Sequence, residues 1–147
     1  MTIATMSKRW QSLDIAREAA WVLLENRTHI SEYNLDQLRD GELSDSSRIK
    51  PKYRNTAYQQ RKSRLYGYKL GGTPDLRYTG DFYRGWVIRL QGENKYSFDS
   101  IDGKRDDLVD KYTIRIFGLN NQSKTEVRER IMQPDLVKRI ESKIFVK

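Results

Sequence analysis

The sequence predicts an α+β fold in a single domain, with a long N-terminal helix, a small antiparallel sheet of three to four strands, C-terminal helices and a long basic loop. Three observations predict it. Apolar residues recur at helical spacing over residues 13–40 and again over residues 120–144, and two alternating runs flank a turn at residues 92–94. At 147 residues the chain is long enough to bury one core but not two.

The stretch of residues 75–90 combines a turn, an aromatic cluster and the start of a strand. Thr79 and Asp81 flank Gly80, a combination that suits a tight turn or one helical turn, because hydroxyl and carboxylate groups cap free backbone N–H groups. We expect the aromatic residues that follow to belong to the core and to hold this turn against the sheet. They are Phe82, Tyr83 and Trp86.

The strands are predicted from alternation. Residues 86–90 and 95–99 alternate around the turn-forming residues 92–94, which indicates a β-hairpin. Residues 113–117 alternate as well and end at Gly118, so we expect a third short strand there.

The N-terminal region is predicted as an arm followed by a helix. Residues 1–11 show no period and form the expected arm, of the kind that is often ordered only by a partner. Ser12 or Asp14 can cap the helix that follows, and Gly41 can end it. The pattern over residues 13–40 fits one long helix or two with a break near residues 26–28, and the absence of Gly and Pro there favours one.

Residues 42–74 are predicted to leave the domain as a long basic loop. Asn55 or Thr56 can cap a short helix over residues 57–64 inside it. The net charge is +8, yet residues 46–74 hold eight Lys and Arg and no acid, which leaves 20 bases against 20 acids elsewhere. A charge localised in this way is typical of a surface that meets a polyanion or an acidic face of another subunit. The eight are Arg48, Lys50, Lys52, Arg54, Arg61, Lys62, Arg64 and Lys69.

Three helices are expected after the hairpin. Residues 106–112 form a short one whose early acids suit the positive end of the helix dipole. Asn120 or Asn121 begins the next, which runs to residue 132, and Pro134 in a first-turn position opens the last.

The composition indicates a protein that depends on neighbours. Apolar residues make up 37% and charged residues 33%, and the mean hydropathy is −0.85, so the core should be modest. The absence of cysteine excludes disulfides and thiolate metal sites. No apolar run approaches the length needed to span a bilayer, and we expect no membrane association.

Signals of catalysis are weak. The single histidine, His29, has no nucleophile or acid at a recognisable spacing, and Gly71–Gly72 lacks the context of a phosphate loop. Four aspartates offer oxygen ligands for Mg²⁺, although turns and helix starts explain them as well. They are Asp99, Asp102, Asp106 and Asp107. We assign no catalytic residue, metal ligand or cofactor, and expect no small-molecule substrate.

The order of short motifs resembles a family of small virion proteins of tailed bacteriophages, particularly those of Bacteroidetes such as the crAss-like phages. The resemblance covers roughly residues 30–140. The matching residues are Asn34, Gln37, Leu38, Gly41, Ser44, Asp45, Asp75, Leu76, Thr79, Gly80, Phe82, Tyr83, Asp102, Lys104, Leu108, Lys111, Tyr112, Ile116, Phe117, Gly118, Leu119, Pro134 and Leu136. One departure is local: where the family often has Lys-Tyr-Gly, this chain has Lys111-Tyr112-Thr113.

The layout is also similar, more distantly, to head–tail connector and tail-completion proteins. That similarity implies a non-catalytic subunit of a homo-oligomeric ring, a hexamer or dodecamer, that docks below the portal in the neck or tail of the virion. It implies neighbouring neck, portal or tail proteins as partners, and transient non-specific contact with packaged DNA.

The basic loop and four aromatic residues are the candidate contact sites. The loop offers Lys and Arg to phosphates and interleaved Tyr rings for stacking, or it meets an acidic subunit face, or its charges are simply solvated. An alternative function is therefore sequence-independent nucleic-acid binding. Large exposed aromatics are favoured at interfaces, so we expect subunit anchors at Trp10, Trp21, Tyr53 and Tyr58.

Overall fold

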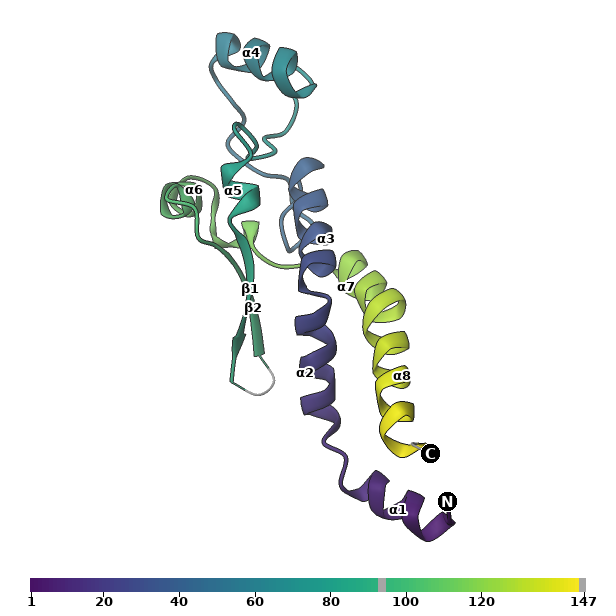
Figure 1. The fold of residues 1–147 in the computed structure, drawn as a ribbon. Coiled ribbons are helices and arrows are strands. Elements are labelled where there is room, and N and C mark those ends of the chain that lie inside the picture. The colour runs from purple at the N-terminus through teal and green to yellow at the C-terminus, as the bar shows by residue number, and fades with distance from the viewer. Residues whose placement is uncertain (93–94, 146–147) are drawn as a thin grey trace.

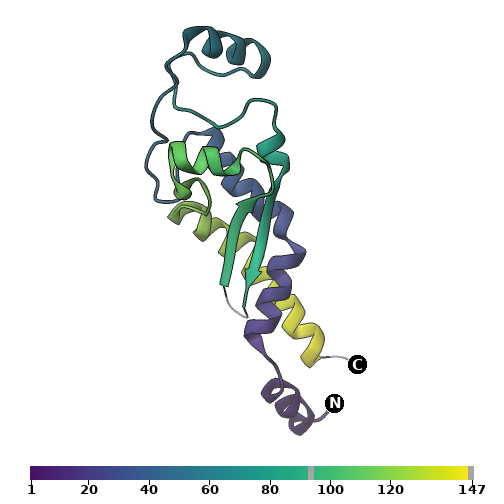
Figure 2. The same ribbon diagram turned by 90° about the vertical axis from the view of Figure 1, so that its left-hand side faces the viewer.

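The computed structural model describes residues 1–92 and 95–145, which form an elongated molecule (Figures 1 and 2). A small helical lobe projects from one end, and both chain termini lie at the other. The helices are α1 (Ile3–Gln11), α2 (Ile15–Glu25), α3 (Arg27–Arg39), α4 (Thr56–Tyr66), α5 (Asp81–Arg84), α6 (Arg105–Tyr112), α7 (Asn121–Val127) and α8 (Gln133–Ile144). The strands are β1 (Trp86–Gln91) and β2 (Lys95–Ser100), a 3₁₀ turn is η1 (Ile114–Ile116), and a π-helical turn is η2 (Arg128–Met132).

The fold is α+β, but its described sheet has two strands, so the prediction of three to four was wrong. The predicted hairpin is confirmed: β1 and β2 are antiparallel, with Trp86 opposite Ser100 and Gln91 opposite Lys95. The turn predicted at residues 92–94 includes residues 93 and 94, which lie outside the described part of the chain.

The third strand, predicted over residues 113–117, is replaced by η1. Thr113 has φ 117°, and its hydroxyl accepts a hydrogen bond from the backbone N–H of Arg115, a local arrangement that turns the chain instead of extending it. Ile116 and Phe117 are buried here. Ile114, in contrast, is exposed, so the alternating apolar residues do not share one buried face as they would in a strand.

The long N-terminal helix was also predicted wrongly, because the chain breaks at Asn26 between α2 and α3. The Asn26 side-chain amide donates to the backbone oxygen of Val22 (2.9 Å) and to Asp135 (3.0 Å). An Asn side chain competes with the backbone for such partners, so it can end a helix without Gly or Pro. Residues 3–11 of the predicted arm form a helix of their own, α1.

The other helices follow their sequence signals. Of the predicted alternatives, Asn55 caps α4 and Asn120 caps α7, each accepting from the N–H three residues later. Pro134 lies in the first turn of α8, as predicted, although α7, η2 and α8 succeed one another without a break. The π-helical turn η2 connects α7 to α8.

Two apolar clusters form the core. The larger packs α3, α5, β1 and α6 against residues 43–49 and 116–117, and it contains the predicted aromatic cluster: Phe82 and Trp86 meet edge to face at 5.3 Å. Leu43 and Ile49 belong to it, so the first residues of the predicted loop are core residues. The smaller cluster joins α3, α7 and η2 through Ile30, Leu119, Val127 and Ile131.

Two amide side chains of α3 clamp the segment that leads into α7. Asn34 is fully buried and bonds the backbone oxygen of Ile116 (3.1 Å) and the N–H of Gly118 (2.7 Å). Gln37 bonds the backbone oxygen of Gly118 (3.0 Å) and the N–H of Asn120 (2.9 Å). These motif residues therefore satisfy buried backbone groups of another motif segment, which is a structural role.

Within the described residues, no helix combines the length and apolar character that crossing a membrane requires.

Candidate functional site

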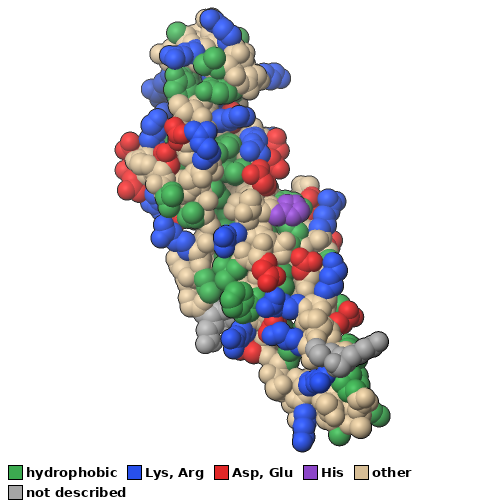
Figure 3. Space-filling view, viewed as in Figure 1, with side chains coloured by type: hydrophobic (Ala, Val, Ile, Leu, Met, Phe, Trp, Pro, Cys, Tyr) green, Lys and Arg blue, Asp and Glu red, His purple; other side chains and the backbone are tan. Residues whose placement is uncertain are grey.

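The projecting end of the molecule is the α4 lobe, which we define as residues 50–78. On the face shown in Figure 3, Lys and Arg side chains gather on this lobe, while Asp and Glu lie closer to the centre of the molecule. The lobe has its own interior of tyrosines. Tyr53 lies edge-on to Tyr58 (5.1 Å) and to Tyr68 (5.4 Å), and Tyr58 stacks on Tyr78 (5.6 Å).

Lys62 lies at the centre of this interior and is fully buried. Its ammonium pairs with Asp75, donates to the Tyr53 hydroxyl (3.0 Å) and lies over the rings of Tyr53 and Tyr68. Burial lowers the pKa of Lys62, and the Asp75 carboxylate opposes that shift. Lys62 was predicted to contact a partner with its charge. In the structure it instead stabilises the interior of the lobe and is not accessible to a partner.

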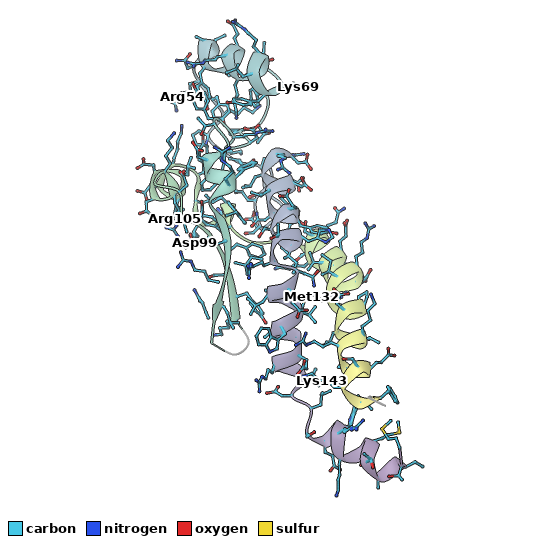
Figure 4. All side chains as sticks on the ribbon, in the orientation of Figure 1. Arg54, Lys69, Asp99, Arg105, Met132 and Lys143 are labelled. Carbon is cyan, nitrogen blue, oxygen red and sulfur yellow. The ribbon has the colours of Figure 1, made fainter. Side chains whose placement is uncertain are left out.

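The other predicted contact cations lie at the surface, in two groups. Arg48 belongs to the central part of the molecule, where it donates to the Asp40 backbone oxygen (2.6 Å) and pairs with Glu42 (3.7 Å). Arg61 lies over the Tyr78 ring (5.7 Å). Figure 4 labels Arg54 and Lys69, both on the lobe. The exposed cations of the lobe are the predicted Lys50, Lys52, Arg54, Arg61, Arg64 and Lys69, together with Arg77.

A crevice of about 670 Å³ separates the α4 lobe from α5 and α6. Its lobe wall includes Tyr58 and Tyr78, which are half-buried, and Lys52 and Arg54, which are exposed. Its far wall is supplied by α6 and the residue before it, and includes Lys104, Leu108, Lys111 and Tyr112. Burial raises the pKa of Tyr112 to about 12, so this hydroxyl stays neutral at physiological pH.

The predicted turn at Thr79–Asp81 borders the crevice. Gly80 has φ +86°, a left-handed conformation that suits glycine, and it precedes α5. The Thr79 hydroxyl donates to Asp81, and the pKa of Asp81 is lowered chiefly by that hydrogen bond, with Arg84 adding to it. The Asp81 carboxylate is therefore engaged within its own turn.

A second candidate surface, the terminal groove, runs between α1 and α8. We define it by Ile3, Met6, Trp10, Val137, Ile140, Ile144 and Phe145, which line an almost wholly apolar groove of about 610 Å³. Ile3 is 86% exposed and Trp10 is 58% exposed. The prediction placed Trp10 in an arm with little cover, and the structure leaves it uncovered on α1.

Trp21 lies on α2 beside an ion-pair cluster that joins α2 to α8. The Arg139 guanidinium lies over its ring (5.8 Å) and pairs with Glu18 (2.6 Å) and Glu25 (2.9 Å). Lys143 also pairs with Glu18, whose side chain is only 5% exposed. Trp21 thus has an intramolecular partner, while Tyr53 and Tyr58 belong to the interior of the lobe.

The structure brings together residues that sequence reasoning missed. Lys104 and Lys111 join the basic lobe at the crevice although they lie roughly 30 to 37 residues beyond the end of the basic loop at residue 74. A signal for them existed, since a spacing of seven residues places two side chains on one helix face. Nothing local in the sequence pairs Glu18 with Arg139 and Lys143.

Four of the residues weighed for catalysis make contacts within the chain, and a fifth, Asp107, is exposed. His29 is exposed, with the Tyr33 ring 6.1 Å away. Asp99 pairs with Arg105 (2.8 Å; Figure 4), Arg105 also pairs with Asp106, and Asp102 accepts the N–H of Lys104 (2.9 Å). No group of three or more potential ligands suitable for a metal ion occurs among the described residues.

Comparison with known proteins found no protein-family model, curated protein or solved structure that matches this chain.

Proposed function

We propose that this protein is a non-enzymatic structural subunit of a tailed-phage virion, a head–tail connector or tail-completion component. It assembles through the terminal groove into a closed homo-oligomeric ring below the portal. The motif order of the sequence supports the virion assignment. One observation carries the assembly: α1 has no buried residue, and it borders an apolar groove.

A helix in the position of α1 needs more support than its own chain supplies. It has nine residues, fewer than the roughly 12–15 at which isolated helices become even marginally stable in water. It contacts α8, and Arg9 donates to the backbone oxygen of Ile144 (2.9 Å). The apolar face is left open, and covering such a face is what stabilises short amphipathic helices in proteins.

The occupant that fits is the terminal face of another copy of the chain. Ile3, Met6 and Trp10 recur at i, i+3 and i+7 on α1, and Val137, Ile140 and Ile144 repeat the same spacing on α8. Each helix thus carries a narrow apolar stripe of the kind that packs against another helix. In a ring, the α1 stripe of one copy packs against the α8 stripe of the next. Because these two patches differ, rotational symmetry can close a set of such contacts into a ring.

The test is the particle formed by Trp10→Glu, compared with Gln11→Glu. Both changes add one negative charge to α1, but only residue 10 lies on the stripe. We expect the unmodified chain and the Gln11→Glu variant to form closed rings in negative-stain images. Trp10→Glu should instead give the 17.4 kDa monomer by size exclusion with light scattering. Circular dichroism should show that all three are folded.

Two results contradict the proposal. The first is an unmodified chain that stays monomeric at tens of micromolar. The second is Trp10→Glu rings as abundant as those of Gln11→Glu.

The cations on the α4 lobe favour a second candidate function, sequence-independent nucleic-acid binding. Phosphate contacts make such binding fall steeply with salt. A monomer that binds random duplex DNA with a steep salt slope supports this candidate, whereas a ring with weak duplex affinity supports the first.

A further inference from the structure

We propose that the crevice between the α4 lobe and α6 is a binding site for single-stranded nucleic acid. One or two bases of the strand lie against the tyrosines of the crevice, and the phosphates of the strand lie along its rim. This goes beyond a ring subunit, and it does not depend on assembly, because the crevice lies at the opposite end of the molecule from the terminal groove.

The rim carries four cations, and the charge of one of them, Lys104, helps to lower the pKa of Asp81. Lys52 and Arg54 contribute from the lobe, and Lys104 and Lys111 from the opposite wall. None of them forms an ion pair with a carboxylate in the described residues; the Lys111 ammonium lies over the Tyr112 ring (5.1 Å). The opposed walls therefore present positive charge to whatever enters between them.

The two acids at the rim, Asp81 and Asp102, already accept hydrogen bonds from the chain itself. Asp81 receives the Thr79 hydroxyl and pairs with Arg84. Asp102 receives the backbone N–H of Lys104, next to the start of α6. Four cations and two carboxylates line the crevice, so its excess charge is positive and suits an anion.

The lobe wall of the crevice also carries aromatic side chains. Tyr58 and Tyr78 stack at an angle of 25°, and both line the opening while half-buried. Arg61 lies over Tyr78 and helps to fix that ring. A flat ring that enters meets a preformed aromatic surface, and stacking on such surfaces tolerates any base.

Tyrosine rings inside the crevice and cations at its rim suit single-stranded nucleic acid better than they suit a duplex or an acidic peptide. In a duplex the bases are paired and hidden, so tyrosines in a crevice have nothing to stack on. An acidic peptide supplies the charge but few flat rings. The volume of about 670 Å³ is within the range of sites that take ligands the size of one or two nucleotides.

The experiment measures anisotropy of four fluorescent probes: a ten-nucleotide oligothymidine, a ten-residue abasic strand of equal charge, a duplex and a polyglutamate peptide. We expect the oligothymidine to bind tightest. Losing the bases should weaken binding about fivefold or more, since stacking of even one base contributes about 1–3 kcal/mol.

The matched variants are Lys104→Ala/Lys111→Ala and Arg64→Ala/Lys69→Ala. Each removes two positive charges, but only the first pair lines the crevice. For the first pair we expect the logarithmic salt slope for oligothymidine to shrink by about 1.4, or roughly 0.7 for each phosphate contact. The second pair should leave the slope near that of the unmodified chain.

Equal losses in the two variants would mean diffuse attraction to the lobe and overturn the site. So would abasic or polyglutamate binding as tight as oligothymidine, the latter pointing to an acidic protein partner. Repeating the titration with the Trp10→Glu monomer separates this site from the ring, because binding should persist when assembly is lost.

Discussion

Lys62 shows how burial assigns different roles to chemically similar side chains. It is fully buried against Asp75 and tyrosine rings, whereas Lys69, on the same lobe, is exposed. A buried charge is tolerated only when it is paired and hydrogen-bonded. Removing Lys62 would leave the Asp75 carboxylate without its ion-pair partner.

We expect Lys62→Ala to loosen the α4 lobe while the rest of the molecule stays folded. Losing the charged partner of a largely buried carboxylate should cost about 2–3 kcal/mol, which corresponds to amide hydrogen exchange in α4 roughly 30- to 150-fold faster. Hydrogen exchange read by mass spectrometry measures this, with Lys69→Ala as the control. Equal protection of α4 in the two variants would argue against a structural role for Lys62.

The sequence identified residues through local signals and missed those whose roles are non-local. The caps at Asn55 and Asn120 were predictable because an N-cap bonds the N–H three residues on. The burial of Lys62 was not, because its partner Asp75 lies across a loop. Lys104 and Lys111 were not assigned to the basic surface, because the fold alone brings α6 opposite the lobe.

At the scale of elements, α2 and α8 are joined by charges rather than by apolar contact alone. Glu18 accepts from both Lys143 and Arg139 in a nearly closed site. The hydrogen bond from Lys143 is the largest influence on the pKa of Glu18; burial opposes it, Arg139 assists it, and the net shift is downward from 4.5. The charged form of Glu18 therefore stabilises the folded state.

We expect Glu18→Gln to lower the free energy of unfolding by about 1–3 kcal/mol at pH 7, since hydrogen bonds to charged groups contribute on that scale. The control, Glu25→Gln, removes an exposed partner of the same Arg139 and should cost about 0–1 kcal/mol. Urea denaturation measures both.

The Glu18→Gln effect should depend on pH in one direction. Because folding lowers the pKa of Glu18, its contribution is complete above about pH 4.5 and is lost as pH falls through the lower folded value. The gap between the unmodified chain and Glu18→Gln should therefore narrow in acid. A gap that is constant from pH 7 to pH 3 would contradict this account.

Element prediction failed where tertiary contacts overrode local patterns. The alternating residues 113–117 resemble a strand, yet the backbone oxygen of Arg115 accepts from Ser44 (2.9 Å) and Ile116 is fully buried, so packing sets the conformation. The hairpin was predicted correctly because its register depends on near neighbours in sequence.

At the scale of the whole molecule, the two candidate surfaces lie at opposite ends (Figure 2). A ring built through the terminal groove would leave the α4 lobes free to face a common direction. Repetition around a ring would multiply weak contacts with one extended polyanion into strong overall binding.

Deleting residues 1–11 should separate assembly from folding. None of the residues of α1 is buried, so we expect the free energy of unfolding of the monomer to change by less than about 1 kcal/mol, in keeping with surface changes. Ring formation should be abolished. Thermal melts and light scattering measure the two effects, and a truncated chain that still forms rings would contradict the assembly proposal.

The clamp made by Asn34 and Gln37 also bears on synthesis of the chain. Their partners lie more than 80 residues later. While the polypeptide is leaving the ribosome, α3 carries two amide groups whose native partners in residues 116–120 have not yet emerged, and distant contacts of this kind form late. Nascent chains that stop before residue 116 should therefore remain sensitive to protease, and resistance should arise in one step once the last quarter has emerged.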